Sequence, residues 1–306
     1  MHFDRYFSEE EFVRTGKVES FLGELRRKGF IYELDGATWF RSTAFGDDKD
    51  RVLIKSTGEM TYISPDAAYH EDKFKRGYDL VVNIWGPDHH GYIPRLKAAI
   101  SALEIDSERL KVIILQLATL YEGETKLSMS TRRGEYVTLR QILDEVGKDV
   151  GRYFFLMRRT DSHLDFDLEL AKKQSLENPV YYIQYGHARI CGIFEKYREV
   201  DGETKKDIGE EDLASLEVLE AEEVELIKKL GLFQEVLEGC STQLDPYSLT
   251  DYLLKIAQSF HHYYAQHRVI SEDLKKSRGR LALVKAVQIV IRNGLELLGV
   301  KAPESM

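Results

Sequence analysis

The sequence predicts an α/β fold that is followed by an all-α fold. Within the first 150 residues, strand-like and helix-like stretches alternate, and an apolar run ends in a loop of Gly, Pro, Asp and His before the next helix. From Thr138 onward, apolar residues recur at helical spacing. Strand, loop, helix and strand in this order are typical of a parallel sheet. A chain of 306 residues is long enough for about two domains, and we expect them at 1–176 and 177–306.

Turn and cap signals define the elements that precede residue 80. Ser8 opens a sequence that resembles a capping box at the start of a helix. An Asp-Gly pair and a Thr-Gly pair each separate two short apolar stretches, which predicts hairpins over 31–41 and 51–63. Ser64-Pro65-Asp66 then begins a helix, because proline is favoured in the first helical turn.

The apolar run at 80–85 predicts a strand that is covered on both faces. A Gly-Pro-Asp-His-His-Gly loop at 86–91 follows it, and we expect a helix over 92–103 and another buried strand over 112–115. In a parallel sheet, ligands bind beyond the carboxyl ends of the strands. The loop at 86–91 is therefore a candidate site.

Long helices are expected in the second half, beginning at Asn178-Pro179, where Asn caps the helix and Pro occupies its first turn. In the last helix, polar residues recur at helical spacing and form one stripe on an otherwise apolar surface. Such helices pack as a bundle. The expected ranges are 178–198, 212–230, 249–266 and 277–298, and the stripe consists of Arg278, Lys285, Gln288, Arg292 and Glu296.

Composition excludes several classes of protein. Hydrophobic residues make up 43% and charged residues 31%, which excludes a disordered or fibrous chain. With only two cysteines, we expect a reducing, cytoplasmic location and no disulfide framework. Charged residues interrupt the longest apolar stretch, so we expect no membrane-spanning helix. The N-terminus is acidic and lacks the apolar core of a signal peptide.

Charge is distributed unevenly around a formal net charge of −9, which disfavours a general nucleic-acid binder. The acidic segment, 201–225, holds eleven acidic and two basic residues, and we interpret it as a solvated helix face. The basic segment, 255–301, holds nine Lys or Arg against three acidic residues, and it includes Phe260, Tyr263 and Tyr264. Recognition of single-stranded RNA uses such basic and aromatic residues together. A plain helical bundle would account for the same composition.

Three groups of polar residues are candidate binding sites. Asp88, His89 and His90 suit an amino group or a ribose, and a metal is not expected because adjacent histidines on a regular strand cannot face one ion. The small and basic stretch at 129–134 suits a phosphate clamp, with a plain polar loop as the alternative.

The third group is Tyr62 and Asp66, which lie four residues apart where a hairpin meets a helix. A buried carboxylate beside a phenol would bind a guanidinium group through paired hydrogen bonds. The alternative for Asp66 is an acidic residue that the helix dipole favours in the first turn.

Several long stretches in one order resemble arginyl-tRNA synthetase, a class I aminoacyl-tRNA synthetase. The resemblance extends over essentially the whole chain. It implies the second half of a Rossmann-type catalytic domain at 1–176 and a helical anticodon-binding domain at 177–306. The stretches are GDDKDRVL (46–53), TYISPDAAYHEDKF (61–74), WGPDHHGYIPRLKAA (85–99), MSTRRGEYVTLR (129–140), LDFDLELAKKQS (164–175), NPVYYIQYGHARI (178–190) and RLALVKAVQIVIRNGLELLGVKAPE (280–304).

The resemblance implies roles for individual residues. Those expected to bind arginine are Tyr62, Asp66 and Asp88. Those expected to bind ATP are His89 and a loop similar to the KMSKS motif, formed by Ser128, Met129, Ser130, Thr131 and Arg132. Those expected to contact tRNA are Tyr185, His187 and Arg189, on a helix that the family lays along the tRNA. The composition of the basic segment adds Tyr264, Arg268 and Arg280 as expected tRNA contacts.

The chain departs from the family pattern in two places. No His-x-Gly-His occurs in the sequence, so the HIGH motif is missing, and Ser128 and Thr131 replace the two lysines of the loop motif. The HIGH imidazoles stabilise charge on the reacting phosphate. We therefore assign no catalytic residue and do not expect this chain alone to aminoacylate tRNA. Half a sheet would also leave an open edge strand and an exposed apolar face.

The expected protein binds tRNA, in the first place an arginine tRNA, and retains half of an arginine and ATP site. One alternative is the C-terminal part or a subunit of an arginine–tRNA ligase that an N-terminal half completes, with ATP and Mg²⁺ as its cofactor. Another is a binding-only protein that chaperones tRNA or docks on a second synthetase. Dimerisation through the open sheet edge is a further alternative, and no membrane partner is expected.

Overall fold

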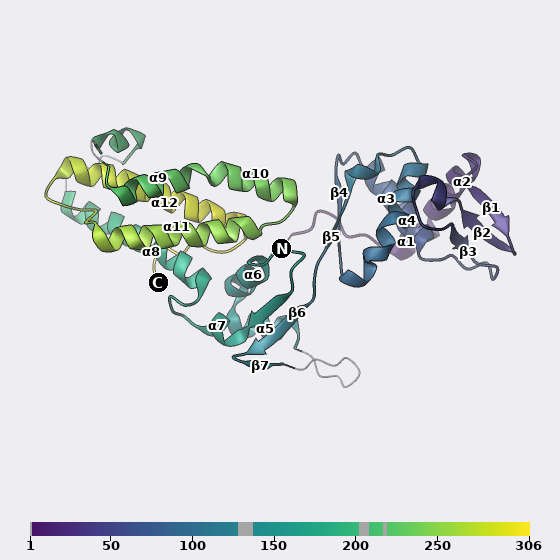
Figure 1. Ribbon diagram of the computed structural model, residues 1–306, viewed down its shortest axis with the longest axis horizontal. Coiled ribbons are helices and arrows are strands. Elements are labelled where there is room, and N and C mark those ends of the chain that lie inside the picture. Colours follow the sequence, from purple (N-terminus) through teal and green to yellow (C-terminus); the bar gives the residue numbers. More distant parts are fainter. Residues whose placement is uncertain (1, 128–136, 202–207, 217–218) are drawn as a thin grey trace. The chain divides into compact units, whose positions relative to one another are not determined.

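The computed structural model describes residues 2–127, 137–201, 208–216 and 219–306. The chain forms two compact units, one ending at Leu115 and the other beginning at Gln116 (Figure 1). The first unit mixes strands with helices, and the second is mainly helical, as the predicted order of an α/β part and an all-α part requires. Among the described residues, no helix is both long and apolar enough to cross a membrane.

The first unit combines an antiparallel sheet of order β1-β2-β3 with a parallel pair of strands, β4 and β5. Its strands are β1 (Ile31–Leu34), β2 (Ala37–Phe40), β3 (Arg51–Ile54), β4 (Val81–Trp85) and β5 (Leu110–Ile114). Its helices are α1 (Glu9–Arg14), α2 (Lys17–Arg27), α3 (Ile63–Lys75) and α4 (Ile93–Ala102), with the 3-10 helices η1 (Ser42–Phe45), η2 (Pro87–Tyr92) and η3 (Ser107–Arg109).

Local signals in this unit act as predicted. Ser8 caps α1, because its hydroxyl accepts a hydrogen bond from the Glu11 backbone N–H at 3.2 Å. Strands β1 and β2 are joined by Asp35 and Gly36, which both have positive φ, as a tight two-residue hairpin requires. The apolar faces of α2, α3 and α4 then bury a common core with β2 and β3.

Two expectations for this unit are wrong in part. Met60 forms only an isolated bridge with Ile54, so the hairpin expected over 51–63 lacks its second strand. Strand β4 is present, but only alternate residues along it are buried, and Val82 and Ile84 on the other face are exposed. Among the described strands, β4 pairs only with β5, so its other edge is unpaired. The exposure of Val82 and Ile84 leaves one apolar face of β4 uncovered.

The second unit places a small sheet of order β7-β6-β8 beside a bundle of helices. Its strands are β6 (Ala118–Glu122), β7 (Thr125–Lys126) and β8 (Leu164–Asp167). Its helices are α5 (Leu139–Val146), α6 (Lys148–Leu156), α7 (Leu168–Lys172), α8 (Pro179–Asp201), α9 (Ala221–Gly231), α10 (Phe233–Gln243), α11 (Tyr247–Gln266) and α12 (Leu274–Leu297), with the 3-10 helix η4 (Glu210–Ser215).

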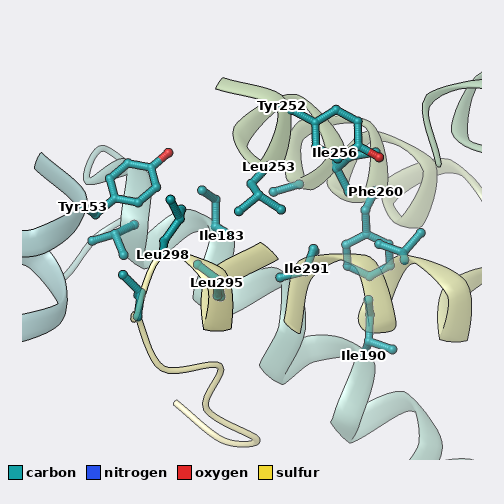
Figure 2. Packing of buried hydrophobic residues seen from close by; sticks show 14 of the residues in the cluster. Tyr153, Ile183, Ile190, Tyr252, Leu253, Ile256, Phe260, Ile291, Leu295 and Leu298 are labelled. Atoms are coloured by element: carbon teal, nitrogen blue, oxygen red, sulfur yellow. The ribbon is translucent and has the colours of Figure 1, made fainter. Parts of the chain in front are cut away.

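One apolar core joins the small sheet to the helices of this unit. Figure 2 shows Tyr153 of α6 close to Ile183 of α8, with side chains of α11 and α12 in the same cluster. The Tyr153 hydroxyl also donates a hydrogen bond to the Thr250 carbonyl oxygen at 3.0 Å. The compact unit begins at Gln116, upstream of the domain boundary predicted at 176/177, because Leu120, Phe154 and Phe166 belong to the same core as the helices of the bundle.

The long helices α8, α11 and α12 lie where the sequence predicts them. Asn178 caps α8 by accepting a hydrogen bond from the Val180 backbone N–H at 3.2 Å. The short elements differ: α9 begins at Ala221 instead of 212, and β8 and α10 were not anticipated. Strand β8 spans only four residues, which is too few for a periodic signal to stand out from its helical surroundings.

Part of the acidic segment is buried, which corrects the expectation of a solvated helix face. The Asp212 carboxylate accepts hydrogen bonds from Arg278 Nε at 2.8 Å and Nη2 at 3.0 Å. Glu223 is fully buried, and its Oε1 accepts a hydrogen bond from Arg280 Nε at 2.9 Å. These acidic side chains thus hold η4 and α9 against α12.

Candidate functional site

The loop after β4 places polar side chains at the carboxyl end of a parallel strand, as predicted. Asp88 Oδ2 lies 3.7 Å from His89 Nε2, and both side chains are exposed. A Cβ atom on Gly86 would lie 2.9 Å from Asp88 Oδ1, so the glycine leaves room for this carboxylate. The His89 ring centre is 6.1 Å from that of Trp85. This surface suits a ligand that combines amino or hydroxyl groups with a flat ring.

Tyr62 and Asp66 lie at the start of α3, and both side chains face solvent. Tyr62 is 87% exposed, and Asp66 is exposed in the first turn. Of the two alternatives for Asp66, a buried carboxylate is therefore the one that the structure does not show. The position agrees with the helix-dipole alternative and leaves the carboxylate accessible to a ligand.

A polar network behind Asp66 links α3 to β4. His70 Nδ1 lies 2.7 Å from the Asp66 carbonyl oxygen and therefore carries a proton, which leaves Nε2 to accept a hydrogen bond from Asn83 Nδ2 at 2.7 Å. Lys73 Nζ donates to Asn83 Oδ1 at 3.1 Å and lies 4.5 Å from the centre of the Tyr69 ring. These bonds attach the second half of α3 to β4.

The same network contains shifted pKa values. Burial, followed by the charge of Arg76, lowers the pKa of Lys73 to about 8, and the Asp66 carboxylate opposes this shift. Burial, followed by the charge of Lys73, lowers the pKa of His70. Burial, followed by the charge of Asp66, raises the pKa of Tyr92. Clusters of shifted pKa values are typical of functional sites.

Two buried polar atoms near this network lack a protein partner. Tyr92 Oη and Arg95 Nε are buried, and neither has a hydrogen bond of good geometry among the described residues. The Arg95 guanidinium carbon lies 5.4 Å from the centre of the Tyr92 ring. Because an unpaired buried polar group costs free energy, these atoms mark a place where a polar ligand or water would be stabilised.

Most of the predicted ATP contacts fall outside the described residues, namely Ser128, Met129, Ser130, Thr131 and Arg132. Only His89 of that set has a described position, at the exposed end of β4. In the described part of the chain, no group of three or more His, Cys, Asp or Glu residues is placed to hold a metal ion. Among the described residues, His89 is therefore the only predicted ATP contact whose position can be compared with the expected site.

In the second unit, four side chains form what we call the Arg189 cluster: Tyr185 and Arg189 from α8, and His261 and Tyr264 from α11. The Arg189 guanidinium carbon lies 4.5 Å from the Tyr185 ring centre and 5.1 Å from that of Tyr264. Its Nη2 donates to Tyr185 Oη at 2.7 Å. An arginine between aromatic rings, one of them at the surface, suits the phosphates and bases of a nucleic acid.

Two other predicted tRNA contacts do not reach the surface. His187 is 3% exposed, and its Nδ1 lies 2.8 Å from the Pro303 carbonyl oxygen. Arg280 is 5% exposed and pairs with Glu223. We therefore withdraw both as direct RNA contacts, since they hold the helical unit together. The Arg268 side chain is exposed and stays a predicted contact.

Sequence reasoning missed the network behind Asp66 and the role of His261. A signal for the network exists: His70 and Lys73 follow Asp66 at helical spacing, and Asn83 is the one amide in an apolar strand. No comparable signal exists for His261, because its contact with Arg189 spans 72 residues and arises only where α11 packs on α8.

Comparison with known proteins matches both parts of the chain to described families. Residues 5–159 match the family described as tRNA synthetases class I (R), catalytic domain. Residues 183–306 match the family described as DALR anticodon binding domain. A catalytic domain followed by an anticodon-binding domain is the order that the sequence resemblance implies.

Curated relatives match nearly the whole chain. The arginine–tRNA ligase of Anoxybacillus flavithermus is 50% identical over 305 residues, which cover 99% of this chain and 54% of the relative. That of Syntrophotalea carbinolica is 49% identical over 306 residues, which cover 100% of this chain and 55% of the relative. The chain thus spans about half the length of these relatives.

Solved structures agree with the sequence comparison. A Campylobacter jejuni structure described as an arginyl-tRNA synthetase is 34% identical, with a TM-score of 0.88, and the match covers 100% of this chain and 65% of that one. The Thermus thermophilus arginyl-tRNA synthetase is 21% identical with a TM-score of 0.77, over 96% of this chain and 59% of that one. At this lower identity the likeness shows the fold alone.

Proposed function

This chain belongs to the arginyl-tRNA synthetase family, and on that premise we propose that it binds an arginine tRNA and carries the guanidinium-reading part of an arginine site. The observation that carries the proposal is the Arg189 cluster, which lies within the part that matches an anticodon-binding domain. A cation held between rings of α8 and α11 suits a nucleic acid without needing a strongly basic chain. We also propose a cytoplasmic location, in keeping with two cysteines that are free thiols.

For the arginine site, we propose Asp66 as the carboxylate that pairs with the substrate guanidinium, with Tyr62 and Asp88 as further contacts. The exposed first turn of α3 leaves the Asp66 carboxylate open to form two parallel hydrogen bonds with a guanidinium group. The Tyr92 hydroxyl interacts with Asp66 and adds a second polar group near it. An accessible carboxylate beside hydroxyl groups suits a cationic side chain.

We further propose that an N-terminal half completes the catalytic site and that this chain alone does not aminoacylate tRNA. The uncovered face of β4 supports this, because Ile84 is 64% exposed and Val82 and Leu80 are exposed beside it. An exposed apolar face of this kind favours packing against a further element. When bound at the completed site with Mg²⁺, ATP would supply the phosphoanhydride that activates the amino-acid carboxylate, and His89 is the described residue that would contact it.

The catalytic part of the proposal is tested by arginine-dependent pyrophosphate exchange. We expect no exchange by the purified chain, and exchange after addition of the N-terminal half of a relative such as the Anoxybacillus flavithermus ligase. In that mixture, Asp66→Asn should raise the KM for arginine about tenfold or more, because a charge-assisted contact is lost. Asp79→Asn, an exposed aspartate, serves as the control. Exchange by the chain alone at the rate of a full-length relative would contradict the proposal.

The RNA part of the proposal is tested by binding of an arginine tRNA transcript at low salt. Arg189→Met should weaken binding about tenfold, because the side chain loses its charge and its phosphate contacts. Arg14→Met removes an exposed charge from the first unit and should leave binding unchanged. The RNA part of the proposal fails if the wild-type chain binds no tRNA at low salt.

A binding-only protein is the second candidate. It is favoured by the loop at 128–132, where Ser128 and Thr131 stand in place of the two lysines of the family's ATP-binding motif. Such a protein would hold tRNA with the same salt dependence, but the N-terminal half would restore no exchange. Binding of tRNA without exchange in the mixture would select this second candidate.

A further inference from the structure

We propose that His261 is a positioning residue that holds the Arg189 guanidinium at the RNA-binding surface while its imidazole is neutral, and that protonation of His261 releases Arg189. This inference rests on the proposed function, because it takes RNA as the ligand of the Arg189 cluster. The site that it regulates would bind a phosphodiester beside an unstacked base.

The geometry fixes how His261 and Arg189 interact. His261 Nδ1 lies 3.2 Å from Arg189 Nη1, and His261 Nε2 lies 3.3 Å from the Tyr182 carbonyl oxygen. A guanidinium group can only donate hydrogen bonds, and a carbonyl oxygen can only accept them. His261 must therefore accept from Arg189 through Nδ1 and donate to Tyr182 through Nε2, which defines one neutral tautomer.

Protonation is incompatible with this arrangement. A second proton can be added only at Nδ1, where it would face the N–H group of Arg189 at a distance of 3.2 Å. The ring would then lose its role as an acceptor and place a positive charge against the guanidinium. Burial of the ring, to which the charge of Arg189 adds, lowers the pKa of His261, in keeping with a neutral ring near pH 7.

Among the other groups around His261, the Tyr182 carbonyl oxygen raises the pKa of the ring by accepting from Nε2, and it offsets the lowering by burial and Arg189 only in part. From α8, the ring meets Tyr182 with ring centres 4.5 Å apart and Tyr185 with ring centres 5.8 Å apart. From its own helix it meets Phe260. No carboxylate contact with His261 is recorded among the described residues, so Arg189 is the one charged group that acts on the ring directly.

The held guanidinium is ready to bind an anion. Two of its N–H groups point at His261 and Tyr185, and the rest have no protein partner among the described residues. Tyr264 lies beside it with 37% of its surface exposed, which leaves ring surface for a base. A guanidinium fork next to an exposed ring is the combination that binds a phosphodiester and stacks a base.

The test measures the affinity of an arginine tRNA transcript between pH 7.5 and 5.5 at constant ionic strength. Protonation of surface histidines would by itself strengthen binding to a polyanion. We expect instead that wild-type affinity falls about fivefold on acidification, as one charge-assisted contact is lost. His261→Gln keeps an acceptor but cannot be protonated, so the affinity of this variant should not fall between pH 7.5 and 5.5, whatever its value at pH 7.5. His262→Gln, the exposed neighbour, should behave like the wild type.

Each outcome has a distinct meaning. Equal pH profiles for the wild type and His261→Gln, with RNA still bound, would overturn the inference and leave the proposed function intact. Absence of RNA binding at every pH would overturn the proposed function. In case His261→Gln fails to fold, ¹⁵N NMR of the wild-type histidine rings provides an independent readout. A ring protonated at Nε2 supports the inference, and one protonated at Nδ1 overturns it.

Discussion

At the scale of single residues, burial decides which polar side chains act structurally and which are open to ligands. Arg189 and Arg280 are both arginines of long helices, yet Arg189 lies between the rings of Tyr185 and Tyr264 and Arg280 pairs with the fully buried Glu223. Removal of one member of a buried ion pair leaves an uncompensated charge, whereas removal of a surface charge costs little stability.

The contrast between Arg280 and Arg268 gives the first prediction. Arg280→Met should lower the free energy of unfolding by about 3–5 kcal/mol, because Glu223 would be left charged and unpaired. Arg268→Glu should leave stability nearly unchanged and weaken tRNA binding about fivefold, with a shallower salt dependence. Urea unfolding followed by circular dichroism and tRNA titrations at two salt concentrations measure both effects. Equal stability of the two variants would contradict the assignment of Arg280.

Lys73 gives a prediction about pH. Its pKa is lowered to about 8 in the folded protein, so the unfolded chain binds more protons between pH 8 and 10, and stability must rise with pH in that range. Residue 73 cannot titrate in Lys73→Met. The free energy of unfolding of the wild type should therefore rise by about 1 kcal/mol relative to that of the variant between pH 7 and 10. This value is reduced to account for the partial exposure of the Lys73 side chain.

Tryptophan fluorescence during urea unfolding measures the Lys73 effect, because both tryptophans of the chain, Trp39 and Trp85, lie in the first unit. Lys49→Met in the same unit is the control, since Lys49 is exposed and no ion pair of its side chain occurs among the described residues. Parallel pH profiles for the wild type and Lys73→Met would show that the Lys73 ammonium is not penalised by burial.

At the scale of elements, close helix contacts build the surface that we propose for RNA. Helix α12 approaches α11 at Gly294, where a Cβ atom would lie 2.6 Å from Leu253 Cδ2. Leu253 is fully buried, so it has little room to move away. The position of α11, which carries His261 and Tyr264, therefore depends on a glycine in the facing helix.

Gly294→Ala should lower the free energy of unfolding by about 1–3 kcal/mol, because it overpacks this contact. Gly239→Ala is a matched control in α10, where nothing lies within 4 Å of the added Cβ atom, and it should stabilise the helix by about 0.5–1 kcal/mol. Urea unfolding of both variants measures the two changes. A stabilising Gly294→Ala would mean that α11 and α12 do not pack this closely.

At the scale of the whole molecule, the uncovered face of β4 is the feature that most needs a partner. Ile84→Lys should leave the first unit folded, because the side chain is 64% exposed and surface changes cost about 0.5 kcal/mol or less. It should prevent association with an N-terminal half, since a charge would be buried without a partner. Ile289→Lys, at an exposed position of α12, is the control. Sedimentation of each variant mixed with the N-terminal half measures association. Unchanged association of Ile84→Lys would mean that the N-terminal half does not contact this face of β4.

Local signals in the sequence were sufficient for the order of the two parts, for the hairpin at 31–41, for the Ser8 and Asn178 caps and for the long helices α8, α11 and α12. Each of these depends on a turn, a cap or a period that a few neighbouring residues determine. The family resemblance also came from the sequence alone, because the motifs that carry it and their order along the chain can be compared without a structure. The same holds for the position of Asp88 and His89 after a strand.

Tertiary structure decided what is buried and what meets across long separations. It placed His187 and Arg280 inside the second unit, left Asp66 in solvent, and brought His261 to Arg189 and His70 to Asn83. It also divided the chain at Gln116, because the small sheet and the bundle share one core. The physical reason is that burial and pairing depend on which surfaces pack together, and this is a property of the assembled core that no local stretch of sequence contains.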